Sequence, residues 1–96
     1  MKVRIYAKPG DEKAFLDELS GQGTYVVIDG QPTGEPLNLY DLVTLCYWSK
    51  GSRRAVEIDC EVVGRRLAHN NKMPRSVKVK AAYREREQIR ALQDEV

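Results

Sequence analysis

The chain has 96 residues, of which 42% are hydrophobic and 31% are charged, and its formal net charge is +2. This size and composition are typical of one globular domain, so we expect a single domain over residues 1–96 and exclude disordered and collagen-like classes. The longest apolar run, at 42–48, is far shorter than the ~20 residues of a membrane span, so no membrane partner is expected.

The first 28 residues predict two strands and one helix. Residues 2–8 alternate between apolar and polar or charged side chains, with Tyr6 on the outward side, which is typical of a half-buried strand. A helix is predicted over 11–20, because Asp11 can accept backbone N–H groups of the first turn and apolar residues recur at helical spacing. The β-branched and aromatic run at 24–28 predicts a second strand.

The segment 38–50 is compatible with two structures. Its β-branched and aromatic composition suits a strand. Helical boundary signals are also present, because Asn38 can cap a helix start and Gly51 stands where helices commonly end. We predict a helix, with a strand as the alternative. The apolar residues that recur at i, i+3, i+4, i+7 and i+8 are Leu39, Leu42, Val43, Cys46 and Tyr47.

The second half predicts two more strands and a terminal helix. Residues 54–63 and 76–83 alternate like the first strand, and a basic polar loop separates them. The tail, 84–96, is rich in helix formers but has a thin apolar face, so we expect a loosely docked helix. The predicted fold is an α+β open-faced sandwich, an antiparallel sheet of about four strands with two to three helices on one face, in the order β-α-β-α-β-β-α.

One stretch resembles a known family. Residues 37–43 read LNLYDLV and are followed by a Lys50-Gly51 turn and the strand segment AVEI at 55–58. This order resembles the phosphocarrier protein HPr family, in which a loop leads to a short Val-Asn-x-Lys-Ser-Ile-Met helix, a Lys-Gly turn and a strand. The resemblance covers about residues 2–60. It implies an antiparallel sheet with helices on one face, and docking of larger proteins through the first two helices.

The chain departs from that family at its reactive positions. The family carries its phosphorylated histidine in a Gly-x-His-x-x-Pro loop after the first strand, whereas residues 9–13 here read PGDEK. A phosphocarrier needs an imidazole nitrogen as nucleophile, so that chemistry is excluded at this place. The position of the family's regulatory serine is matched by Asp41, which cannot be phosphorylated in that way. The resemblance therefore implies the fold without the phosphocarrier activity.

Cysteine usage indicates a cellular compartment, and the distribution of charge indicates a class of partner. Cys46 and Cys60 have no metal-binding or redox spacing, and the N-terminus lacks the apolar block of a signal peptide. We therefore expect reduced, buried thiols in a cytoplasmic protein. Residues 50–90 hold twelve of the sixteen basic residues and only five of the fourteen acidic ones, which suits either an anionic partner or a solvated surface.

Catalytic and metal sites find little support. Glu57, Asp59 and Glu61 recur at period two and could bind Mg²⁺ for phosphoryl transfer or nuclease chemistry, but we interpret them as solvent-facing strand positions. His69 is the only histidine and is interpreted as an exposed loop residue. We assign no catalytic residue, no metal site and no cofactor.

Nucleic-acid binding is the first alternative function. Arginines of the segment 50–86 could contact phosphates while a base stacks on Trp48, although no recognised nucleic-acid motif is present. The residues assigned to this alternative are Lys50, Arg53, Arg54, Arg65, Arg66, Lys72 and Arg75.

The sequence as a whole predicts a small non-catalytic binding or regulatory protein that acts through a protein–protein surface. The partner contacts are assigned to Phe15, Asp41, Leu45 and Trp48. A metal-dependent enzyme that uses the carboxylate stripe is the second alternative. The apolar face of the tail helix adds the expectation of a homodimer formed through that helix.

Overall fold

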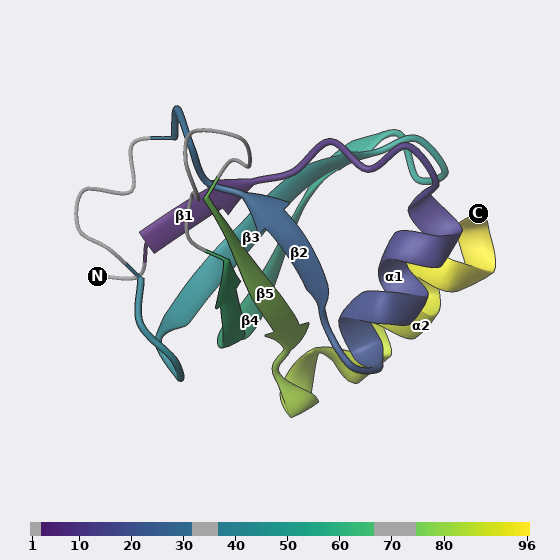
Figure 1. Ribbon diagram of the computed structural model, residues 1–96. Helices are drawn as coiled ribbons and strands as arrows, with labels where there is room; N and C mark the ends of the chain where they lie inside the picture. The colour runs from purple at the N-terminus through teal and green to yellow at the C-terminus, as the bar shows by residue number, and fades with distance from the viewer. Residues whose placement is uncertain (1–2, 32–36, 67–74) are drawn as a thin grey trace.

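The chain forms a mixed α+β domain, seen in a computed structural model that describes residues 3–31, 37–66 and 75–96 (Figure 1). The strands of the described residues are β1 (Val3–Tyr6), β2 (Thr24–Val27), β3 (Leu42–Ser49), β4 (Arg54–Arg66) and β5 (Ser76–Ala81). The helices are α1 (Glu12–Ser20), the 3-10 turn η1 (Tyr83–Glu85) and α2 (Arg86–Glu95). The α+β class predicted from the sequence is confirmed, with one strand more than the approximate four.

The five strands make one curled sheet in the order β1-β3-β4-β5-β2, so β1 and β2 are its two edges. β3, β4 and β5 are antiparallel neighbours, whereas β1 runs parallel to β3. The Gln31 side chain joins the two edges. Its amide donates to the Tyr6 oxygen at 2.7 Å and to the Val27 oxygen at 2.8 Å, and accepts from the Tyr6 N–H at 2.7 Å. These bonds satisfy edge groups that would otherwise attract another strand.

The core lies between one face of the sheet and the two helices. In β1, β4 and β5 the residues that enter the core alternate along the strand, as the period-two pattern predicts, whereas in β3 five consecutive residues, Val43 to Tyr47, are buried. Each large aliphatic side chain so buried contributes on the order of 2 kcal/mol. The helices meet this face with Phe15, Leu16 and Leu19 from α1 and Ile89 and Leu92 from α2.

The prediction of a helix over 38–50 is wrong, because Leu42–Ser49 forms β3. All eight residues of β3 pair with β4, and four of them also pair with β1. These long-range ladders outweigh the helical spacing of the apolar residues. The HPr resemblance implies a helix in this segment, whereas the chain has a strand here.

The C-terminal segment docks through its apolar residues. Ile89 and Leu92 are 2% and 1% exposed, so the thin apolar face of α2 is used inside this domain. η1 is held to β4 at Asp59, whose N–H donates to the Glu85 carboxylate at 2.6 Å and whose own carboxylate pairs with Arg84 at 2.8 Å. No helix in the described residues is both long and apolar enough to cross a bilayer.

A single carboxylate ties the β3–β4 turn to the start of α1. Glu12 accepts hydrogen bonds from the Tyr47 hydroxyl at 2.9 Å, the Ser49 hydroxyl at 2.6 Å and the Gly51 N–H at 3.1 Å. Burial raises the pKa of Glu12, but the hydrogen bonds from Ser49, Gly51 and Tyr47 together lower it below its ordinary value. The ionised form of Glu12 therefore holds the turn in place. The Asp11 carboxylate caps the same helix by accepting from the Ala14 N–H at 3.1 Å, as predicted.

Candidate partner-binding site

The sheet residues that alternate with the core residues point away from the helices and form an outer face. At one end of this face lies a shallow groove of about 440 Å³, which we call the aromatic groove. β1, β3 and β4 supply its walls, and the side chains that matter for its chemistry are Arg4, Tyr6, Cys46, Trp48, Ala55 and Glu57.

Strand register brings the two aromatic walls together. Tyr6 is the partner of Cys46 across the parallel β1–β3 pair, and Trp48 lies two residues further along β3 on the same face. Trp48 is opposite Ala55, whose small side chain leaves room beside the indole. Trp48 is 60% exposed and Tyr6 is 53% exposed, although both belong to regular strands. Large apolar surface in such a rigid setting is typical of a binding site.

Two of the charged side chains in the groove, Arg4 and Glu57, are paired, and Lys8 adds a further cation to the lining. Arg4 forms an ion pair with Glu57, and its guanidinium also lies 3.6 Å from the Cys46 sulfur. Both members of the pair are about half exposed, and such pairs contribute about 0–1 kcal/mol to stability. Burial raises the pKa of Cys46, which the contact with Arg4 offsets only in part. The thiol is therefore protonated near neutral pH and is a poor nucleophile.

The carboxylate stripe continues from the groove across the middle of the outer face. Glu57, Asp59 and Glu61 alternate with buried β4 residues, as the sequence predicts for solvent-facing positions. Two of them carry cationic partners, Arg4 on Glu57 and Arg84 on Asp59. Within the described residues no group of three or more His, Cys, Asp or Glu side chains could hold a metal ion.

The residues assigned to a protein partner from the sequence do not form one surface. Leu45 is fully buried, and Phe15 packs edge-on against Tyr47 with ring centroids 5.3 Å apart. The Asp41 carboxylate accepts from the Asn38 N–H at 2.8 Å in the segment before β3. Trp48 alone of the four lines the aromatic groove.

The residues assigned to an anionic partner fall into two groups. Lys50, Arg53 and Arg54 belong to the turn and the start of β4, whereas Arg65 and Arg66 end the same strand. Arg65 lies eleven positions after Arg54 along the strand, which is about 35 Å of extended chain. Lys72 and His69 lie outside the described residues.

Local contacts occupy three of these arginines. Arg66 stacks 3.9 Å from the ring centre of Tyr25, and Arg75 pairs with Asp29 at 2.7 Å. Arg65 donates to the Leu37 oxygen at 3.3 Å. The described basic residues therefore do not make one continuous basic surface.

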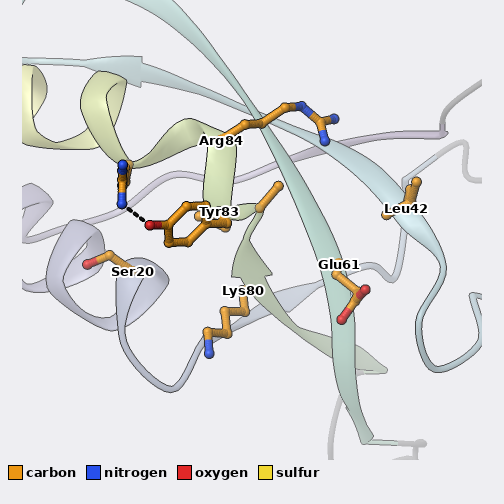
Figure 2. A pocket seen from close by; sticks show the side chains of 9 residues that line it. Ser20, Leu42, Glu61, Lys80, Tyr83 and Arg84 are labelled. Carbon is orange, nitrogen blue, oxygen red and sulfur yellow. Dashed lines mark hydrogen bonds between the residues drawn. The ribbon is translucent and has the colours of Figure 1, made fainter.

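A second hollow of about 590 Å³ opens at the other end of the outer face (Figure 2), and we call it the cationic pocket. It lies where β5 leads into η1 and α2, and it also touches β3, β4 and the last residue of α1. The side chains that decide its chemistry are Leu42, Glu61, Lys80, Tyr83, Arg84 and Arg86. Sequence reasoning missed it, because its cations come from three different elements.

Tyr6 could have been assigned to a site from the sequence. Strict alternation over 2–8 placed it on the outward side, and an outward tyrosine on a strand is a recognisable signal. Comparison of the chain with protein-family models, curated proteins and solved structures finds no match.

Proposed function

We propose that this chain is a non-catalytic binding domain that docks a segment of a partner protein in the aromatic groove. The observation that supports this function is the exposure of Trp48 and Tyr6 on two adjoining strands, on either side of a groove that is mostly apolar. An apolar side chain of the partner would fill the space above Ala55 and lie between the two rings.

The residue types in the groove favour a protein as the occupant. Tryptophan, tyrosine and arginine dominate the binding energy of protein–protein interfaces, and Trp48, Tyr6 and Arg4 line the groove together. Burying the exposed part of such an aromatic ring contributes about 2 kcal/mol or more to association. Both rings already sit on paired strands, so little ordering is needed on binding.

The carboxylates beside the groove disfavour a polyanion. Glu57 lines the groove itself, and Asp59 follows two residues along the same face of β4. Their ion pairs with Arg4 and Arg84 occupy the two guanidinium groups that a phosphate backbone crossing this face to stack bases on Trp48 would need as partners. Nucleic-acid binding stays the alternative function, and metal-dependent catalysis through the carboxylate stripe is the less favoured one.

Trp48 is the only tryptophan of the chain, so its fluorescence reports directly on the groove. We would select peptides from a random display library on the immobilised domain and titrate the purified peptides against it in solution. Docking of an apolar side chain should shift the Trp48 emission to shorter wavelength. Affinity should fall about tenfold or more in Tyr6→Ala and in Trp48→Ala, the latter followed by calorimetry.

Tyr83→Ala is the matched control, because Tyr83 is a 76% exposed aromatic residue outside the groove. Peptides whose affinity is unchanged in Tyr6→Ala and Trp48→Ala would contradict the proposal. A single-stranded oligonucleotide that quenches Trp48 fluorescence in a strongly salt-dependent manner would favour the nucleic-acid alternative instead.

A further inference from the structure

The cationic pocket is separate from the aromatic groove. Leu42 borders the pocket and Trp48 borders the groove, and Trp48 lies six positions further along β3, about 20 Å of extended strand. Neither hollow shares a lining residue with the other. Binding of a ligand in the cationic pocket can therefore be tested independently of the function proposed for the aromatic groove.

Positive charge in the pocket is supplied from three elements. Lys80 comes from β5 and Arg84 from η1, both labelled in Figure 2, and Arg86 is the first residue of α2. Arg84 is committed to Asp59 at 2.8 Å. Lys80 makes no hydrogen bond or ion pair with any residue in the described ranges, although Glu61 stands opposite it on β4.

Tyr83 contacts Arg86 both through its hydroxyl group and through its ring. Its hydroxyl oxygen accepts a hydrogen bond from Arg86, shown as a dashed line in Figure 2, and the Arg86 guanidinium carbon lies 4.3 Å from the ring centre. Because the oxygen is accepting from Arg86, the hydroxyl proton can be donated to a ligand. The Lys80 ammonium, the Tyr83 hydroxyl and the Arg86 guanidinium thus provide three kinds of donor around one hollow.

We propose that the cationic pocket binds a small organic phosphate, a phosphate monoester whose organic part packs on the apolar wall. A phosphate monoester carries about −1.5 to −2 charges at neutral pH and three acceptor oxygens. The two cations not committed to Asp59, Lys80 and Arg86, match that charge, and the Tyr83 hydroxyl supplies a further donor. Leu42 and Ala82 form the apolar wall for the organic part.

A carboxylate fits the same donors less well. It carries one charge and two oxygens, so it would leave part of the Lys80 and Arg86 charge uncompensated. Glu61 also lines the pocket, and its negative charge opposes any anion. Removing this charge should therefore strengthen binding, which gives a variant with a gain of affinity that loss of folding cannot imitate.

The test uses phenyl phosphate as the probe and benzoate as its carboxylate counterpart, titrated by calorimetry at low ionic strength with the full chain. Phenyl phosphate should bind about tenfold tighter than benzoate. Lys80→Ala and Arg86→Ala should each weaken phenyl phosphate about tenfold, and Glu61→Gln should tighten it about threefold. Arg90→Ala is the matched control, since Arg90 is an exposed cation one turn further along α2 and outside the pocket.

The pH dependence gives a second readout. The second ionisation of a phosphate monoester has a pKa of about 6, so affinity should rise between about pH 5 and pH 7.5 as the ligand gains negative charge. The proposal would be overturned if benzoate bound as tightly as phenyl phosphate, or if no binding of phenyl phosphate were detected. It would also be overturned if Arg90→Ala weakened phenyl phosphate binding as much as Lys80→Ala and Arg86→Ala. Trp48→Ala should leave phenyl phosphate binding unchanged, which separates this result from the outcome for the aromatic groove.

Discussion

Replacing Glu12 by alanine is expected to destabilise the fold by about 3 kcal/mol. The Ser49 hydroxyl is fully buried and Tyr47 is 4% exposed, so both donors would lose their acceptor where water cannot easily replace it. An orphaned buried donor costs about 1–2 kcal/mol. The Gly51 N–H lies in an exposed turn and can be hydrated, so its bond adds less. For a domain of this size the loss corresponds to about 10–20 °C in the melting temperature.

The assay is urea unfolding followed by circular dichroism, with Glu18→Ala as the control. Glu18 belongs to the same helix but is exposed, so its removal should change stability by no more than about 0.5 kcal/mol. A Glu12→Ala variant within about 0.5 kcal/mol of Glu18→Ala would refute the reasoning, because the bonds from Tyr47 and Ser49 would then contribute nothing net.

The same carboxylate makes stability depend on pH in a defined window. The folded-state pKa of Glu12 lies below its ordinary value of 4.5, so the unfolded chain takes up the proton first as pH falls. The contribution of Glu12 is therefore complete above about pH 4.5 and is lost as pH falls through the folded-state pKa. The difference in stability between wild type and Glu12→Ala should accordingly shrink in acid, measured by urea unfolding at a series of pH values.

Three further outcomes are expected. Gly51→Ala should lower stability by about 1–3 kcal/mol in urea unfolding, since an added Cβ would lie 2.9 Å from a backbone oxygen at the end of α2, whereas Gly10→Ala has open space and should be neutral. Gln31→Ala should lower stability by about 1–2 kcal/mol, because edge groups of β1 and β2 lose their shared partner. Burial raises the pKa of Cys60 to about 12 and also raises that of Cys46. Neither thiol should therefore react with a thiol reagent at about pH 8 until the chain unfolds.

Strict alternation was a reliable guide to β1 and β4, because each has one buried and one outward face. The segment 38–50 could not be decided in that way. Its apolar residues satisfy the helical spacing and, read as alternate positions from Val43 to Tyr47, also satisfy the strand spacing. The ladder with β4 joins residues up to nineteen positions apart, from Leu42 to Glu61, and a local pattern carries no information about such contacts.

The helical period that was assigned to residues 38–50 also explains why some of the predicted partner contacts are misplaced. On a helix, Leu45 and Trp48 share a face, since they are three residues apart. On a strand, an odd separation places them on opposite faces, and Leu45 is buried while Trp48 is exposed. The helix prediction places Cys46 in the apolar stripe that faces the core, whereas in the structure Cys46 lines the aromatic groove. The cationic pocket depended on the relative placement of β5, η1 and α2, which no single segment specifies.

The Gln31 side chain bonds to both edges of the sheet, and this affects how a partner could bind. An extended peptide commonly adds to a sheet by pairing with the backbone of an edge strand. Here the Tyr6 N–H and oxygen and the Val27 oxygen are already bonded to Gln31, so an incoming strand would have to displace that side chain from both edges. The Trp48 and Tyr6 side chains, by contrast, are 60% and 53% exposed where they project from β3 and β1 beside the small Ala55. Recognition by an inserted apolar side chain is therefore the mode that this sheet favours over strand addition.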